Sequence, residues 1–275
     1  MWRKLFWIAF IVLATHVYSP SYAGSQQGLV QSQFSVEEAA HFAKQVEKYA
    51  ARQGARVFIL ARLGSPSDQL PEGIHFTHVG LAVYSTIQSH DGEILKGYAI
   101  HNLYQNADDL SRSQLVMDYP VDFFLGAFEL KAGIIIPSQI VQQKMLAALE
   151  QGLNHQLHNP QYSIISNPYS SAYQNCTEHL LDLLFAAIYS TNSLPQIKAN
   201  QRAWFKAHQI EVSPLKRLLA PVFSSEIQMR DQGKSIQVAT FTSIANFMRQ
   251  YGLAVKVLSL DKDTLSLDQL SISRL

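Results

Sequence analysis

The chain contains one cysteine, Cys176, at a position where a thiol can act as a nucleophile. Asn175 is a preferred helix N-cap residue, and Glu178 completes a capping-box-like pair. The apolar residues that follow recur at helical spacing, so we expect Cys176 at the first helical position, facing the interior. Unpaired backbone N–H groups and the helix dipole favour a thiolate there. The alternative is a structural cysteine that completes a core helix.

The partner that a reactive thiol needs is an imidazole, and His78 is the first candidate. Residues 76–84 alternate with period two, which predicts a strand with Val79 on its core face and His78 on the other. Gly80 and Ala82 share the face of His78 and leave room there for another element. His78 is therefore a candidate general base, although a lone histidine is more often structural.

His101 is the second candidate, on the strand predicted over residues 95–104. A two-residue turn at Asp91-Gly92 would place His101 on the face of His78 and opposite Ala82, about 13 Å along the strand from His78. A looser turn within residues 86–92 would be needed to bring the two imidazoles together.

The remaining pattern predicts helices and strands in alternation with a polar loop before Cys176. We expect helices over residues 35–52, 138–153 and 243–251, a short helix or loop over 120–126, strands over 55–63, 129–136, 235–240 and 253–258, and a polar, irregular segment over 105–119. Tyr169 and Tyr173 in the loop, together with Asn175, are candidate substrate contacts because loops often carry binding residues.

The first residues of the chain resemble an export signal. Arg3 and Lys4 precede a short apolar run, and Ser21 and Ala23 are the small residues that a signal peptidase recognises. We therefore interpret residues 1–23 as a cleaved signal peptide and 24–34 as a linker. This predicts a periplasmic or secreted protein with no stable transmembrane segment after cleavage. The net charge of +1 gives no electrostatic argument for binding nucleic acid. We divide the mature chain into a core domain, 35–192, and an α/β extension packed on it, 193–275.

The motifs around these residues resemble a known group of proteins. A strand with His78-Val-Gly-Leu, a second strand with a polar residue, and Asn175-Cys-Thr-Glu-His opening an apolar helix are similar to the circularly permuted NlpC-type papain-like proteins, which include lecithin retinol acyltransferase-like enzymes. Phe76-Thr-His-Val-Gly, Met117-Asp-Tyr-Pro, Asn167-Pro-Tyr-Ser and Tyr173-Gln-Asn-Cys resemble the bacterial domain of unknown function 2145, over residues 35–260.

The resemblance implies an α+β, papain-like fold with Cys176 as nucleophile and His78 as general base. The matching third position is His101, with Asn102 on the opposite face of that strand. We expect an exported cysteine hydrolase or acyl-transfer enzyme that acts on an amide or ester bond of a cell-envelope substrate. Peptidoglycan peptide is the first candidate, and a lipid is another. The competing interpretation is a non-catalytic papain-like module that binds an envelope ligand or partner.

No cofactor or metal site is predicted. His75 and His78 are three residues apart on a strand, so their side chains face opposite ways. His155 and His158 share a helical face without an obvious third ligand, and His179 most resembles a surface residue of its helix.

Overall fold

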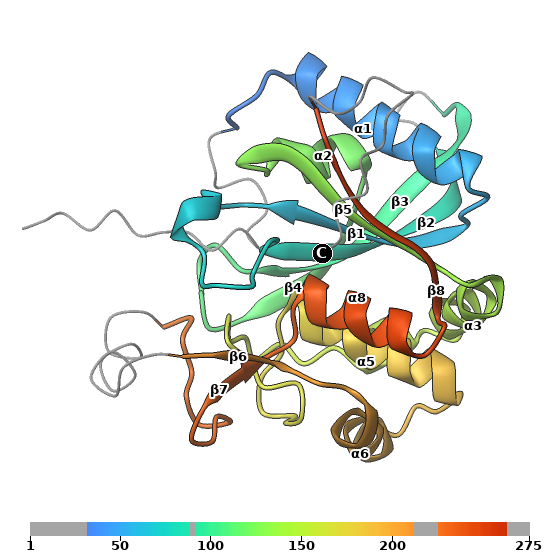
Figure 1. Ribbon diagram of the computed structural model, residues 1–275. Coiled ribbons are helices and arrows are strands. Elements are labelled where there is room, and N and C mark those ends of the chain that lie inside the picture. Colours follow the sequence, from blue (N-terminus) through green and yellow to red (C-terminus); the bar gives the residue numbers. More distant parts are fainter. Residues whose placement is uncertain (1–31, 89–91, 212–224, 263–275) are drawn as a thin grey trace, which may run out of the picture.

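The protein is built around one six-stranded antiparallel sheet with strand order β4-β3-β2-β1-β5-β8. The computed structural model describes residues 32–88, 92–211 and 225–262 (Figure 1). The predicted signal peptide, residues 1–23, lies outside the described residues. The strands are β1 (Val57–Leu63), β2 (His78–Gln88), β3 (Ile94–Gln105), β4 (Ser113–Asp118), β5 (Glu129–Pro137) and β8 (Ala254–Asp261). Two short strands, β6 (His208–Ile210) and β7 (Ile236–Val238), pair separately.

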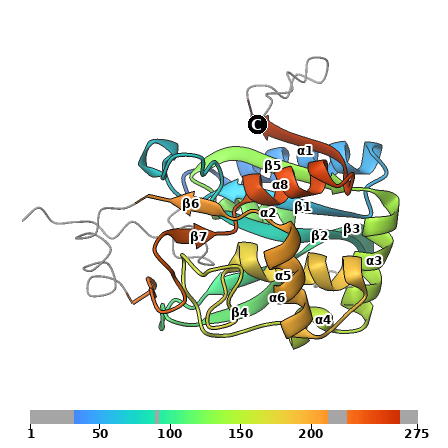
Figure 2. The ribbon, with the colours of Figure 1, turned by 60° about the horizontal axis from the view of Figure 1, so that its bottom comes forward.

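Helices cover both faces of the sheet and make it the middle of three layers (Figures 1 and 2). One face packs against α1 (Val36–Arg52) and α2 (Pro120–Leu125). The other packs against α3 (Gln139–Glu150), α5 (Cys176–Tyr189) and α8 (Phe241–Gln250). The remaining helical segments are the 3-10 turn η1 (Ser67–Gln69), α4 (Leu153–Gln156) and α6 (Leu194–Trp204). The expectation of a mixed α+β protein is confirmed.

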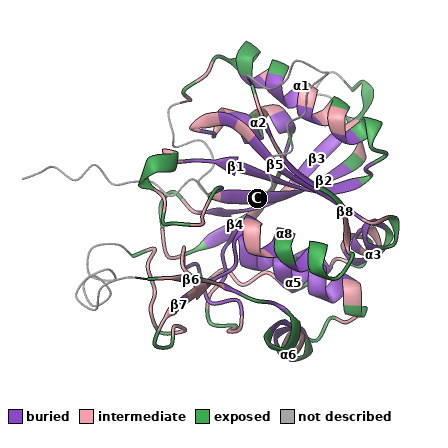
Figure 3. Ribbon diagram, in the orientation of Figure 1, coloured by how far each residue is buried: buried purple, intermediate pink, exposed green. Residues whose placement is uncertain are grey.

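Strand β1 shows why two separate cores form. All seven of its residues are buried, as expected for a central strand covered on both faces. Ile59 and its odd-numbered neighbours enter the core with α5, while Phe58 and Leu60 enter the core with α1 and α2. Figure 3 shows this burial running through the sheet and along α5. The sheet therefore has two dry faces, and any polar side chain on it needs a partner.

Local signals placed most of the elements correctly. α1 begins with the predicted capping box, in which Ser35 and Glu38 satisfy each other's backbone N–H groups. The prediction for residues 105–119 is wrong in part, because β4 lies there. Pairing with β3 imposes an extended conformation on this edge segment.

The segment after residue 192 is joined to the main sheet. Strand β8 pairs with β5 along most of its length, and α8 packs Phe241 into the core shared with α5. Within the described residues, no helix is both long and apolar enough to cross a membrane.

Candidate active site

Cys176 is the first residue of α5, as its neighbours predicted. The side-chain oxygen of Asn175 caps the helix by accepting from the Glu178 N–H at 3.0 Å, and the Asn175 amide donates to the Ile164 carbonyl at 2.9 Å. The Thr177 hydroxyl lies 2.8 Å from both Asn175 Oδ1 and the Ala239 carbonyl. These bonds hold the start of α5 against the loop at residue 164 and the segment before α8, so the position of the thiol is fixed from two sides.

Only half of the predicted capping pair forms. The Glu178 side chain turns inward, where it accepts from Ser166 and from Lys198 Nζ, the latter at 2.7 Å. Lys198 also binds Asp182 at 2.7 Å, which links α6 to α5 through one ammonium and two carboxylates. All three side chains are almost completely buried. Burial raises the pKa of Glu178 to about 8, since the repulsion by Asp182 adds to it and Lys198 only partly compensates.

The thiol of Cys176 is buried, with 5% of the residue exposed. Burial raises its pKa, although the nearby backbone N–H groups of Val79 and Thr177 and the charge of Arg62 favour the thiolate. The expectation that the helix start alone would produce a thiolate is therefore wrong for this conformation, because desolvation outweighs the helix N-terminus. The group at rest is a neutral thiol surrounded by donors that favour its anion.

The Val79 N–H reaches the sulfur because β2 and β3 separate there. Their pairing ends at Leu81 and His101, so the first residues of β2 have no partner on β3. Beyond this point, β3 pairs with β4 as far as Gln105. The N–H of Val79 is therefore not used in pairing with β3 and lies near the sulfur. Since Val79 follows His78 in the chain, the sulfur lies near the backbone of His78.

His78 is held by Asn102. Its Nε2 lies 3.0 Å from Asn102 Oδ1. The Asn102 amide nitrogen donates to Asp118 Oδ1 at 2.7 Å and to the Ile100 carbonyl at 3.1 Å, so the amide oxygen must face His78. Nε2 therefore carries the proton. Nδ1, buried and without a hydrogen-bond partner among the described residues, keeps its lone pair.

Gly80 makes this contact possible. A Cβ at Gly80 would lie 2.4 Å from Asn102 Oδ1 and 2.6 Å from a methyl carbon of Ile100. Only glycine lets the Asn102 amide lie this close to β2. The expectation that small residues near His78 leave room for another element is confirmed, and the side chain that enters is Asn102.

A buried polar network continues behind His78. The imidazole stacks on Tyr104, with ring centroids 4.7 Å apart, and Tyr104 donates to Asp118 Oδ2 at 2.8 Å. The Arg62 guanidinium lies 5.2 Å from the ring centroid of Phe123 and is only 1% exposed. Burial and the charge of Arg62 lower the pKa of His78 well below its ordinary value, so the imidazole is neutral. Burial raises the pKa of Asp118 to about 6.

The structure brings His78 and Cys176 to one backbone segment without joining their side chains. His78 packs against Phe123 of α2, whereas Cys176 shares the α5-side core with Val79. His78 Nδ1 accepts no bond from the thiol. The imidazole and the thiol therefore lie on opposite faces of the sheet, both close to the end of β2 that is not paired with β3.

His101 is not part of this network. It pairs with Leu81 and not with Ala82, so it lies on the face opposite His78, and the predicted register is wrong. The ladder closes at Gln88 and Ile94 and leaves a longer connection than a two-residue turn. A shift of one residue reverses the face of every side chain.

His101 lies instead near His155, whose charge adds to burial in lowering its pKa. Buried His179, predicted at the surface, binds Asn154 Oδ1 at 2.9 Å, and burial together with the neighbouring histidines lowers its pKa to about 3. In the part of the chain that the structure describes, no group of three or more histidine, cysteine or acidic residues is arranged to hold a metal ion.

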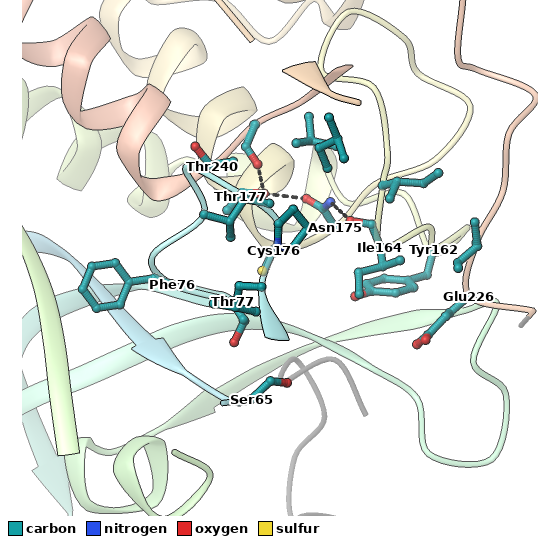
Figure 4. Close-up of a pocket in the computed structure, with 18 of the residues that line it drawn as sticks. Ser65, Phe76, Thr77, Tyr162, Ile164, Asn175, Cys176, Thr177, Glu226 and Thr240 are labelled. Atoms are coloured by element: carbon teal, nitrogen blue, oxygen red, sulfur yellow. Dashed lines mark hydrogen bonds between the residues drawn. The ribbon is translucent and has the colours of Figure 1, made fainter. Parts of the chain in front are cut away.

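A cavity of about 290 Å3 opens beside the thiol (Figure 4). Cys176, Asn175 and Thr177 line it together with Phe76 and Thr77, which directly precede His78. Figure 4 shows the sulfur pointing toward the segment that carries Thr77. The cavity therefore lies between the two chain segments that carry the candidate nucleophile and base.

Tyr169 and Tyr173 do not line this cavity. The Tyr169 hydroxyl donates to the Phe205 carbonyl at 2.8 Å and accepts from the Ala207 N–H at 3.0 Å, which ties the loop to the end of α6. The Tyr173 hydroxyl lies 3.5 Å from Gln228 Oε1. Of the three predicted substrate contacts, only Asn175 lies at the cavity.

The sequence interpretation did not assign roles to Asn102, Asp118 or Arg62. Asp118 lies in the Met117-Asp-Tyr-Pro motif, which was a usable signal. No sequence signal pointed to Arg62, because a single arginine in an apolar strand does not reveal its partners.

No curated protein and no solved structure matches the chain. One family model does match, over residues 49–248, and its description is "Uncharacterized protein conserved in bacteria (DUF2145)". Because this match covers most of the chain, the protein belongs to the DUF2145 family of bacterial proteins.

Proposed function

We propose that this protein is an exported cysteine hydrolase or acyltransferase that acts on an amide or ester bond through a thioester on Cys176. One observation carries the proposal: Asn102 fixes the His78 imidazole in the tautomer whose free Nδ1 can take a proton, and the backbone N–H next to His78 lies close enough to Cys176 to favour its thiolate. A nucleophile, a base and a group that orients the base are the three parts such a reaction requires.

The two groups are neutral at rest, which determines the order of events. Because the pKa of the thiol is raised and that of the imidazole is lowered, proton transfer to His78 Nδ1 accompanies attack on the carbonyl, as in general base catalysis. For this transfer the two side chains must come together at the open end of the β2–β3 pair, where the pairing stops at Leu81 and His101. Catalytic hydrogen bonds are often absent before substrate binds.

The remaining steps use the same groups. The sulfur–carbon bond forms, and the oxyanion is stabilised by backbone N–H groups at the start of α5. His78 returns its proton to the leaving alcohol or amine. Water or an acceptor hydroxyl then attacks the thioester, His78 takes the proton of that nucleophile, and the departing sulfur recovers it.

The papain-like fold belongs to this proposal. A cysteine at the start of a helix that packs on an antiparallel sheet, with the histidine on β2 and the asparagine on β3, supports it. The histidine precedes the cysteine in the chain, which is the order expected of the permuted group. Peptidoglycan peptide is the first candidate substrate that the sequence suggests.

The experiment is a comparison of wild type with Cys176→Ser on released envelope material and on small ester and amide substrates. We expect Cys176→Ser to abolish turnover and to leave the thermal midpoint of unfolding within a few degrees. Full turnover by Cys176→Ser would overturn the proposal.

The second candidate function is a non-catalytic module that binds an envelope ligand. The deep burial of the thiol and the unmade bond between His78 and Cys176 favour it. In that case wild type would show no turnover of any substrate, and Cys176→Ser would leave ligand binding intact.

A further inference from the structure

The cavity beside Cys176 is mainly apolar, which bears on the class of substrate. Its lining comes from several separate parts of the chain: residues 65–77 around η1, the loop before Cys176, the start of α5, Ile210 of β6, and residues 226–227 and 238–240 before α8. The apolar residues among them are Leu70, Pro71, Ile74, Phe76, Tyr162, Ile164, Ile165, Ile210, Ile227, Val238 and Ala239. Transfer of a hydrocarbon group from water into a cavity with this lining is favourable.

The charges in the cavity argue against an anionic substrate. Among the described residues that line it, Glu226 is the one charged side chain, and no lysine, arginine or histidine is present. Glu226 accepts from Gln105 Nε2 at 3.1 Å, which holds its carboxylate at the cavity wall. Peptidoglycan peptides carry free carboxylates, and a buried carboxylate without a cationic or hydrogen-bonding partner is strongly disfavoured.

The cavity has a polar group of residues next to the thiol. Asn175, Thr177 and the sulfur of Cys176 lie together at the start of α5. The other polar residues of the lining are Ser65, Gln69, Thr77, Glu226 and Thr240. A ligand that places one carbonyl at the start of α5 and hydrocarbon against the apolar residues matches both. An unbranched acyl group bound through an ester, thioester or amide has this form.

We propose that the group transferred to Cys176 is an apolar acyl chain and not a peptidoglycan peptide. This inference rests on the proposed function. The chain enters the cavity, the sulfur attacks the acyl carbonyl, and the carbonyl bond to the leaving alcohol, thiol or amine breaks. His78 supplies the proton to that leaving group, and water then releases the fatty acid with the proton passing back through His78 to the sulfur.

The test uses p-nitrophenyl acetate, butyrate, hexanoate and octanoate with the full-length mature protein. Release of p-nitrophenolate and the mass added to Cys176 are both measured. We expect kcat/KM to rise by about fourfold for each CH2 that is buried, until the cavity is filled.

Ile227 is the residue to change, because it is half-buried, lines the cavity and belongs to neither α5 nor β2. In Ile227→Asp we expect the ratio of octanoate to acetate kcat/KM to fall at least tenfold, whereas the matched Ile227→Leu keeps the wild-type ratio. If Ile227→Asp is not folded by circular dichroism, Ile74→Asp serves as the second variant.

The outcomes separate the two proposals. Acylation of Cys176 by acetate with a rate that is flat or falls with chain length would overturn the acyl-chain inference and leave the thiol mechanism standing. So would cleavage of a purified peptidoglycan peptide faster than octanoate. No acylation of Cys176 by any ester would overturn the proposed function itself.

Discussion

Asn102 Oδ1 lies 3.0 Å from His78 Nε2, and this bond determines which nitrogen of the imidazole is free. Because the Asn102 amide also donates to Asp118, the orientation of the imidazole depends on three strands, β2, β3 and β4. Arrangements in which a base is oriented by a third group are the general pattern of nucleophilic catalysis.

Asn102→Ala removes the group that fixes the tautomer of His78. We expect the rate of Cys176 acylation by p-nitrophenyl acetate to fall by about 10²-fold, the lower limit of what a positioned base contributes. The pH profile should also change, because His78 is no longer held with its proton on Nε2. Asn192→Ala, on an exposed loop, is the control. A wild-type profile in Asn102→Ala would refute the assignment.

Gly80→Ala places a methyl group against Asn102 Oδ1 and Ile100. Such overpacking of a buried position destabilises a protein by about 1–3 kcal/mol. Urea denaturation measures the change in the free energy of unfolding. Gly233→Ala is the matched control, since a Cβ there meets no atom within 4 Å among the described residues. Equal stability of the two variants would show that the close approach at Gly80 is absent.

Lys198→Met leaves the buried carboxylates of Glu178 and Asp182 without their cation. Removing one partner of a buried ion pair destabilises a protein by about 3–5 kcal/mol. We expect a loss in this range at pH 7, measured by urea denaturation. The exposed Lys48→Met is the control, and a loss of the same size in both variants contradicts the prediction.

Glu178 also predicts how the stability of the wild type depends on pH. Its pKa is raised to about 8 in the folded protein from an ordinary 4.5, so the unfolded chain releases this proton first. The stabilisation is complete below pH 4.5 and is lost as the pH rises toward 8. We expect the contribution of this group to lower the free energy of unfolding by about 1 kcal/mol or more between pH 5 and pH 8. Glu178→Gln should flatten this slope, and an unchanged slope in that variant contradicts the assignment.

The resting thiol should be slow to alkylate. Burial raises the pKa of Cys176, so at pH 7 iodoacetamide should modify the folded protein at least tenfold more slowly than the protein in urea. The rate should increase steadily as the pH is raised above 8. Rapid modification of the folded protein at pH 6 would mean that the thiolate is already formed.

Local sequence signals predicted the parts of this structure that depend on near neighbours in the chain. The cap at Asn175 and the strand that carries His78 are set by residue type and spacing, and both are confirmed. The face of His101 was not predictable in this way, because it depends on a one-residue difference in hairpin register.

Long-range packing explains what the sequence interpretation missed. The helix start at Cys176 suggested a thiolate, but burial reverses this, and the core that buries the thiol includes residues far away in the chain, such as Ala239. Arg62 and Asp118 look like surface residues when each is read alone, and the sequence did not show that they lie next to His78. They are buried together because α2 covers them, and the close contact of Arg62 with Gly126 is visible only in three dimensions.

The most direct test of the central claim is the pre-steady-state rate at which p-nitrophenyl acetate acylates Cys176, in wild type, His78→Gln and His101→Gln. We predict that His78→Gln is about 10²–10⁴-fold slower than wild type and that His101→Gln acylates at the wild-type rate. Mass spectrometry of proteolytic peptides tests in each case whether the acetyl group is on Cys176. Equal rates in wild type and His78→Gln, or a loss confined to His101→Gln, would contradict the account.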